Sequence, residues 1–191
     1  MSEPHSLPCS SANDFNVHQD ELNGPVCRQV FAELQAEFAR LAKIVRPLPP
    51  EARPSVLPPG SIFLVAEARD EGESQSPDPD ETPYPLVAGS LVVVPLEPGA
   101  RSTNGLRQGG KVAEVKRIVT RSAYRRRGVA GALLATIEGI ARSELGLEVL
   151  VLETNHAMVG AQKTYERYGW KRREAYGWYN SDDSVCYEKR L

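Results

Sequence analysis

Residues 124–134, with the sequence YRRRGVAGALL, combine positive charge and small side chains in a way that suits the binding of a phosphate group. Three arginines, Arg125, Arg126 and Arg127, run directly into Gly128, and an apolar repeat with helical spacing follows. The first turn of a helix carries backbone amides without partners and a partial positive charge, so it binds phosphate directly. Small residues there leave the amides accessible. The segment therefore predicts a pyrophosphate site between a strand and a helix, and a solvent-exposed basic turn is the alternative interpretation.

Other phosphate-binding loops are excluded by the motifs that the sequence lacks. It contains no GxxxxGK[ST], and no GxGxxG follows a predicted strand. The 191 residues carry a net charge of -2, whereas proteins that coat nucleic acid carry a basic excess. We therefore expect the arginines to bind a local ligand, and we expect no nucleic-acid partner.

The three cysteines, Cys9, Cys27 and Cys186, lie far apart and show no CxxC or Cys/His spacing of the kind found in metal sites. Their odd number argues against a disulfide framework, so we expect reduced thiols, a cytoplasmic location and no bound metal. Residues 1–14 lack the basic and apolar regions of a secretory signal, and no run of ~18 apolar residues could span a bilayer. We therefore expect no membrane partner and a disordered lead at residues 1–12.

The elements that must position the basic turn are predicted from hydrophobic patterns and from the prolines and glycines that interrupt them. In the first half, a helix is expected from Pro25 to Val45, where a proline-rich stretch ends it. The acidic segment 70–83 is expected to be a mobile insertion, and residues 98–110 a second flexible connector. The strands predicted in this half are residues 14–19, 61–68 and 85–97.

The second half has a denser pattern. Residues 111–120 (KVAEVKRIVT) are predicted as a strand with Val115 and Val119 on one face, and a helix follows the basic turn. The near-continuous apolar run of residues 147–154 predicts a buried central strand. The remaining predicted elements are a helix at 158–168 and strands at 170–179 and 184–191. This order, β-α-β-β-β-α-β-α-β-β, predicts one domain over residues 13–191, of α/β (α+β) class, with a mixed sheet.

The basic turn resembles motif A of the GNAT superfamily of acetyl-CoA-dependent N-acetyltransferases, because residues 125–130 match its [R/Q]xxGx[G/A] signature. AEVKRIVT (113–120) is similar to the fourth strand of that family, and AQKTYERYGW (161–170) to its AxxxYExxGF pattern. NSDDSVCYEKRL (180–191) resembles the closing strand. The resemblance is close over residues 111–191 and extends to the first half only in the order of elements.

The resemblance implies a GNAT fold: a single mixed, mostly antiparallel twisted sheet of seven strands, flanked by helices and splayed between the fourth and fifth strands. It also implies acetyl-CoA as co-substrate, with pantetheine paired to the fourth strand and pyrophosphate on the helix start. Many relatives carry Asn or Gln where this chain has Met158, so either Asn155 substitutes or the contact is lost. The cofactor-binding residues expected on this basis are Ile118, Val119, Thr120, Arg125, Arg126, Arg127, Gly128, Val129, Ala130, Gly131, Asn155 and Ala161.

Acetyl transfer requires that the acceptor amine lose a proton and that the departing thiolate gain one. Tyr165 occupies the family's tyrosine position and would protonate or hydrogen-bond the thiolate, and a tyrosine packed in the core is the alternative. Glu114, on the strand beside the acyl-CoA groove, would act as general base. The alternative for Glu114 is an ordinary ion pair with Lys116 or Arg117. Further candidates for the base are Glu153 and His156.

The acceptor site lies outside the recognisable motifs, and residues 176–185 (YGWYNSDDSV) are the candidate for its rim. Trp178 and Tyr179 are expected to form an apolar wall, and Asp182 and Asp183 could attract an ammonium, although aromatic packing beside a solvated turn explains the same residues. We expect a small-molecule primary amine as the substrate, acetylated by direct attack in a ternary complex, in a monomer or homodimer. The alternatives are a protein N-acetyltransferase and a non-catalytic coenzyme-A-binding sensor.

Overall fold

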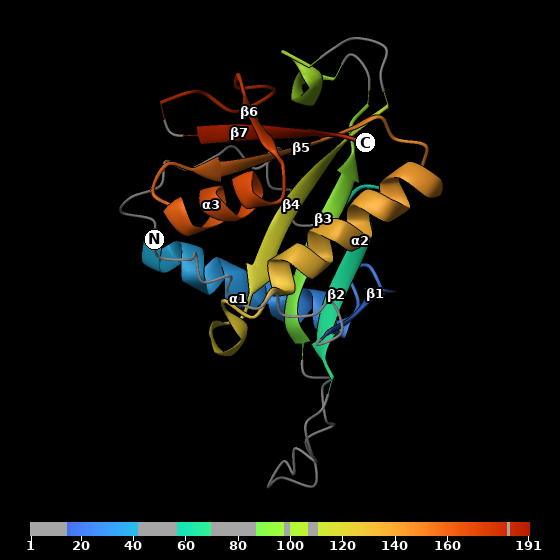
Figure 1. Ribbon diagram of the computed structural model, residues 1–191, viewed down its shortest axis with the longest axis vertical. Coiled ribbons are helices and arrows are strands. Elements are labelled where there is room, and N and C mark those ends of the chain that lie inside the picture. The colour runs from blue at the N-terminus through green and yellow to red at the C-terminus, as the bar shows by residue number, and fades with distance from the viewer. Residues whose placement is uncertain (1–14, 42–56, 70–86, 98–99, 107–110, 183) are drawn as a thin grey trace, which may run out of the picture.

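The computed structural model describes residues 15–41, 57–69, 87–97, 100–106, 111–182 and 184–191 (Figure 1). The expected lead at 1–12 and acidic insertion at 70–83 lie outside the described residues, as do Cys9, Val45 and Asp183. The elements, with η for short 3-10 helices, are β1 (Phe15–Asp20), α1 (Pro25–Leu41), β2 (Ile62–Ala68), β3 (Val87–Pro95), η2 (Arg101–Thr103), β4 (Val112–Thr120), η3 (Ser122–Tyr124), α2 (Val129–Ser143), β5 (Val149–Asn155), α3 (Val159–Arg167), β6 (Lys171–Arg173) and β7 (Ser184–Arg190).

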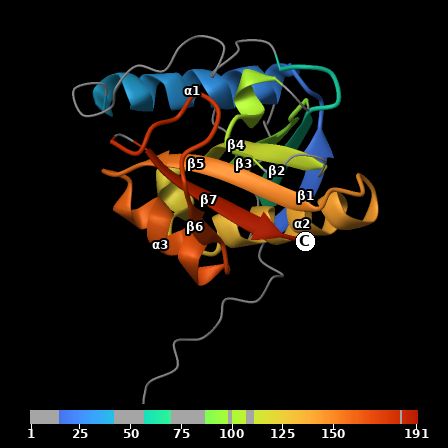
Figure 2. The same cartoon turned by 90° about the horizontal axis from the view of Figure 1, so that it is seen from above.

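The described strands form one seven-stranded sheet in the order β1-β2-β3-β4-β5-β7-β6. Every neighbouring pair is antiparallel except β4 and β5, which are parallel. Figure 2 shows α1 on one face of this sheet and α2 and α3 on the other. The predicted class, a mixed and mostly antiparallel sheet flanked by helices, is confirmed.

Each face of the sheet carries its own core because successive side chains of a strand point to opposite faces. In β2, Leu64 joins the core beneath α2 and α3, whereas Phe63 and Val65 join the core beneath α1. Both faces are therefore covered by helices, which explains why β2 and β3 read as nearly continuous apolar runs rather than as alternating ones.

The sheet opens between β4 and β5. These strands pair only from Val112 with Val149 to Val115 with Leu152. Beyond that point β4 continues to Thr120 with β3 as its neighbour, while β5 follows β7 to Asn155. The predicted splay between the fourth and fifth strands is confirmed, and it leaves the β5-facing edge of β4 without a recorded strand partner after Val115 within the described residues.

A β-bulge lies in β4 at the start of this opening. The pairing of β3 with β4 shifts by one residue between Ser90 and Val92, and Arg117 adopts a φ of 53°. The prediction that Val115 and Val119 share a face is therefore wrong: Val115 packs beneath α2 and Val119 beneath α1. The extra residue of the bulge inverts the alternation of side chains that the sequence pattern assumes.

Two loop segments also differ from the predictions. Of the strand expected at 170–179, only Lys171–Arg173 is a strand, and the following residues form a loop. That loop packs on residues 100–106, which were expected to be flexible, and Leu106 and Tyr176 share a small core there. Gly177 lies so close to this segment that a Cβ would approach the Ser102 carbonyl oxygen to 2.7 Å. Tertiary packing, absent from local sequence patterns, orders both segments.

Candidate active site

The basic turn joins the end of β4 to the start of α2 and has the backbone shape of an anion site. Arg126 and Gly128 both have positive φ values, 65° and 91°. The first intrahelical hydrogen bond of α2 runs from the Ala132 N–H to the Gly128 carbonyl, at 3.0 Å. The amides of Val129, Ala130 and Gly131 precede that bond, so helix geometry leaves them without intrahelical acceptors. This run of amides at a helix N-terminus fits a pyrophosphate.

The side chains of the three arginines, all exposed, are not equivalent. The Arg127 guanidinium lies over the rings of Tyr124 and Phe15, at 5.4 and 5.8 Å from their centroids. The Arg125 Nε donates a hydrogen bond to the Thr120 carbonyl at 3.4 Å. These contacts fix the turn to β4 and β1. In contrast to Arg125 and Arg127, Arg126 has no side-chain contact recorded with the described residues.

Gly131 makes a packing contact that the sequence does not predict. A Cβ at this position would overlap the hydroxyl group and ring of Tyr168, which directly follows α3. The glycine therefore lets the end of α3 lie against the first turn of α2. Gly89 has a related role on β3, because a Cβ there would overlap the Val119 carbonyl oxygen at the bulge.

Ile118, Val119 and Thr120 form the part of β4 expected to bind pantetheine. Val119 and Thr120 pair with Ser90 and Gly89 of β3 on one edge. Their other edge faces the opening between β4 and β5, where the described strands record no pairing beyond Val115. The backbone there can form β-type hydrogen bonds with an extended ligand, irrespective of side-chain type.

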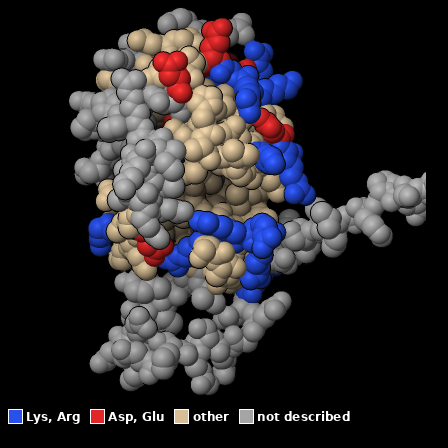
Figure 3. Space-filling view, turned by 90° about the vertical axis from the view of Figure 1, so that its left-hand side faces the viewer, with Lys and Arg blue, Asp and Glu red and all other residues tan. Residues whose placement is uncertain are grey.

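Figure 3 shows this side of the molecule, the left-hand side of Figure 1, toward which β5 runs. The surface is hollowed at its centre, and mostly uncharged residues line the hollow. Lys and Arg side chains gather along its lower and right-hand edges. A basic rim around a hollow is suited to an anionic ligand.

Tyr165 lies on α3 in the core beside this opening. Its ring centroid is 5.5 Å from that of Tyr187 and 6.4 Å from that of Trp170, and the residue is buried. Burial raises the pKa of the Tyr165 phenol far above its usual value, and the negative charge of Glu153 adds to this effect. The phenol is therefore protonated at neutral pH and can donate a hydrogen bond. Ala161, one turn earlier on α3, packs against the same core.

Glu114 belongs to a cluster of four side chains on the α1 side of the sheet, here called the Glu114 cluster: Glu114, Lys116, Tyr176 and Tyr179. Its Oε1 accepts hydrogen bonds from Tyr176 Oη at 3.0 Å and Tyr179 Oη at 2.5 Å. Its Oε2 lies 2.7 Å from Lys116 Nζ, which also donates to Tyr179 Oη at 2.7 Å. Both carboxylate oxygens thus have partners, and the ion pair with Lys116 that was the alternative interpretation is present.

The two tyrosines bring the loop after β6 onto β4. Burial raises the pKa values of Tyr176 and Tyr179 above the usual value, with the charge of Glu114 as the next cause, so both remain hydrogen-bond donors. Tyr179, predicted as an apolar wall, acts here through its hydroxyl, while Trp178 is partly buried. Asp182 is exposed, and its N–H donates to Asn180 Oδ1 at 3.0 Å.

Sequence reasoning missed Lys116 as a site residue, and it placed Tyr176 in the candidate rim at 176–185 without predicting its contact with Glu114. Lys116 could have been found, because residues two apart on a strand share a face and Glu114 was already a candidate. Tyr176 has no such signal, since it reaches Glu114 from a loop 62 residues away in the chain. Arg117, the other expected ion partner, instead lies over the Phe31 ring at 4.1 Å.

The other candidate bases differ in position. Glu153 lies on β5 opposite Cys186, and its Oε1 accepts a hydrogen bond from Ser184 Oγ at 2.8 Å. Because side chains alternate between the two faces along a strand, Glu153 lies on the same face of the sheet as Val151, the residue that pairs with Glu114. His156 is exposed, and its Nε2 lies 3.0 Å from the Ser181 carbonyl oxygen, an acceptor, which requires Nε2 to be the protonated nitrogen. Glu153 is therefore closer to the Glu114 cluster in the sheet than His156 is.

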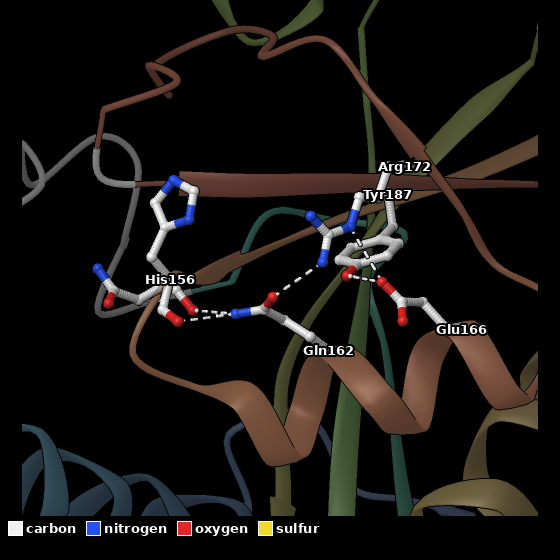
Figure 4. Close-up of polar contacts among 6 residues, drawn as sticks. His156, Gln162, Glu166, Arg172 and Tyr187 are labelled. Carbon is white, nitrogen blue, oxygen red and sulfur yellow. Dashed lines mark hydrogen bonds and ion pairs between the residues drawn. The ribbon is translucent and has the colours of Figure 1, made fainter.

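A buried glutamine holds the start of α3 against the end of β5 (Figure 4). Gln162 Nε2 donates to the Asn155 and His156 carbonyls at 3.1 and 2.9 Å. The Asn155 side chain accepts a hydrogen bond from the Ala157 N–H at 2.8 Å, so its Oδ1 stabilises the same turn. Met158, which precedes α3, makes no side-chain capping hydrogen bond, and Gln162 supplies the polar contacts that secure this turn.

The same network extends to the last two strands (Figure 4). Arg172 of β6 donates to Gln162 Oε1 at 3.2 Å and to Glu166 Oε1 at 2.9 Å. Tyr187 Oη of β7 also donates to Glu166 Oε1, at 3.0 Å. Because the ring of Tyr187 packs on Tyr165, this network fixes the surroundings of the Tyr165 phenol.

Two general features complete the description. Within the described residues there is no group of three or more His, Cys, Asp or Glu side chains arranged to hold a metal ion. None of the helices among them has the length and apolar character needed to cross a membrane. Cys27 and Cys186 are buried free thiols, and burial raises the pKa of Cys186 to about 12.

Solved structures share this fold at low sequence identity. A Klebsiella pneumoniae protein assigned as an acyl-CoA N-acyltransferase has a TM-score of 0.62 at 23% identity, over 95% of this chain and 99% of its own. NAA60 of Arabidopsis thaliana, in complex with a bisubstrate analogue, has a TM-score of 0.62 at 14% identity, with 92% and 99% covered. A GNAT acetyltransferase of Elizabethkingia anophelis, solved with acetyl-CoA bound, has a TM-score of 0.52 at 14% identity, with 94% and 99% covered.

A search of curated protein sequences gave no match. The sequence does match the Acetyltransferase (GNAT) family over residues 32–170, which is more than half of the 191 residues. That range includes the basic turn, the open strand pair and α3. The chain therefore belongs to the GNAT family of acetyltransferases.

Proposed function

We propose that this acyltransferase moves the acetyl group of acetyl-CoA to the primary amine of a small molecule, by direct attack in a ternary complex. The observation that carries the proposal is the opening between β4 and β5, which has the basic turn at its end and Tyr165 and Glu114 beside it. A site for an extended anionic ligand and a site for an acceptor thus meet at this opening, beside a phenol and a carboxylate that can donate and accept protons.

The residues at the opening fit acetyl-CoA. The amides from Val129 to Gly131 would receive the pyrophosphate, with the Arg126 side chain beside it, and residues 118–120 would bind the pantetheine through their backbone. When bound, acetyl-CoA supplies the thioester that the amine attacks. In this arrangement Arg125 and Arg127 hold the turn in shape through Thr120 and the aromatic rings, rather than by direct contact with phosphate.

Acetylation of a protonated amine removes two protons from its nitrogen. Glu114 would take the first, which frees the lone pair to attack the thioester carbonyl carbon as the C–S bond breaks and the C–N bond forms. Tyr165 would give a proton to the departing sulfur, and the second amine proton balances that loss, so one proton is released per turnover. Because its pKa is raised, the Tyr165 phenol keeps its proton at neutral pH, and its O–H can donate a hydrogen bond to the sulfur as negative charge develops there.

Two observations support a small acceptor. Glu114 is 5% exposed, and the loop carrying Tyr176 and Tyr179 lies directly over it. A proton acceptor so enclosed favours a compact amine over a side chain on a folded protein.

The buried free thiols Cys27 and Cys186 support a cytoplasmic location for the enzyme.

The test is thiol release from acetyl-CoA with a panel of primary amines, using the wild type, Tyr165→Phe and Glu114→Gln. We expect amine-dependent release by the wild type, with kcat lowered about 100-fold by either substitution, a typical factor for loss of a general acid or base. Calorimetry should show that Tyr165→Phe still binds acetyl-CoA. Binding of acetyl-CoA without turnover of any amine would instead favour the sensor alternative.

A further inference from the structure

The ion pair of the Glu114 cluster presents both signs of charge at one point of the proposed acceptor site. Glu114 Oε2 and Lys116 Nζ are 2.7 Å apart, and the two side chains are 6% and 13% exposed. The pair lies at the position where β4 leaves β5, since Val115 is the last residue of β4 that pairs with β5. An inference about this pair rests on the proposed function, because it concerns the acceptor of the same reaction.

Glu114 is held firmly enough to change partners without losing its position. Its Oε1 is fixed by two phenol donors, Tyr176 and Tyr179, from a loop that itself packs on residues 100–106. Only Oε2 depends on Lys116. If Lys116 turned to another anion, the carboxylate would stay in place with one oxygen open to an ammonium.

Lys116 sets a requirement on the acceptor. An amine without a negative group would approach Glu114 beside the like charge of Lys116. If that amine displaced Lys116 from the Glu114 carboxylate, this nearly buried lysine would be left without its anion. Separating one partner of a buried ion pair is costly because an uncompensated charge remains. An acceptor that brings its own carboxylate avoids this cost, since each charge of the pair exchanges one partner for another.

We propose that the acceptor is a free α-amino acid, whose ammonium binds Glu114 and whose carboxylate binds Lys116. The two receiving atoms are neighbours, so the matching groups of the ligand must be neighbours too. In an α-amino acid both groups are bonded to the same carbon. Polyamines lack the carboxylate, and in a peptide the terminal ammonium and carboxylate are separated by the chain. The exchange also frees Glu114 Oε2 to take the amine proton.

The test measures kcat/KM by thiol release for the common α-amino acids, for the corresponding amino-acid amides, and for spermidine, with the 191-residue chain and saturating acetyl-CoA. We expect at least one amino acid to exceed its amide by about 10- to 100-fold, the range of a charge-assisted hydrogen bond. In Lys116→Gln the ratio of kcat/KM for the amino acid to that for its amide should fall to about one, whatever the loss common to both substrates. Lys116→Arg should keep most of the discrimination.

Lys111→Gln provides a matched control, because it removes the same charge from an exposed residue just before β4 and should leave both substrates unaffected. Thermal unfolding verifies that each variant is folded. Equal or better turnover of amides or spermidine by the wild type would overturn the inference while leaving acetyl transfer intact. So would equal losses for acid and amide in Lys116→Gln. No thiol release with any acceptor would overturn the proposed function as well.

Discussion

Replacing Gly131 by alanine probes the contact that joins the two helices beside the proposed cofactor site. A Cβ at residue 131 would overlap the hydroxyl and ring of Tyr168, so the tyrosine or the first turn of α2 must shift. Gly139 lies in the same helix, and a Cβ there meets no atom within 4 Å. Both substitutions gain similar helix propensity, so the difference between the two variants isolates the overlap.

Overpacking of a close contact costs about 1–3 kcal/mol. We therefore expect the free energy of unfolding of Gly131→Ala, measured by urea denaturation, to be lower than that of Gly139→Ala by about this amount. Calorimetry should show weaker acetyl-CoA binding in Gly131→Ala alone. In a Tyr168→Ala background the penalty of Gly131→Ala should largely vanish. Equal stability and equal affinity of the two alanine variants would refute the packing of α3 on the start of α2.

Two further predictions concern the polar network and the buried tyrosines. In Gln162→Leu the carbonyls of Asn155 and His156 lose their donor, so we expect the free energy of unfolding to fall by about 1–3 kcal/mol. We also expect kcat to fall more than the affinity for acetyl-CoA. The exposed substitution Lys163→Leu is the control, and an unchanged kcat in Gln162→Leu would contradict the positioning role. The pKa values of Tyr165, Tyr176 and Tyr179 are raised in the folded protein, so above pH ~10 only the unfolded chain releases these three protons. The contribution of these groups to the free energy of unfolding should therefore be fully present below pH ~10. Above that pH, the free energy of unfolding should fall by up to about 4 kcal/mol per pH unit. Urea denaturation between pH 8 and 11 measures this slope, and Tyr179→Phe should make it shallower; an identical slope would show that Tyr179 ionises freely in the fold.

The second half of the fold was predictable because local signals agreed with one another there. The basic turn, the apolar run of β5 and the glycine after α3 each mark an element boundary, and the structure moves these boundaries by only one or two residues. The bulge in β4 was not predictable, because Arg117 adopts a positive φ without the glycine or asparagine that usually announces one.

In the candidate site too, some residues were predictable from the sequence and others were not. Glu114 and Tyr165 could be proposed from their places in the family's patterns. Tyr176 falls within the strand predicted at 170–179, and aromatic residues do favour strands, yet packing of its loop against residues 100–106 overrides that preference. The separate packing roles of Arg127 and Gly131 depend on Phe15 and Tyr168, partners that are distant in sequence.

The most direct test of the central claim is calorimetric titration of acetyl-CoA into the wild type and into a double variant, Gly128→Glu with Arg126→Glu. These substitutions put carboxylates at the amides that we propose for the pyrophosphate. We predict micromolar binding by the wild type and no measurable binding by a double variant that unfolds thermally like the wild type. Equal binding by both proteins, or none by the folded wild type, would contradict the assignment of the opening between β4 and β5 as the acetyl-CoA site.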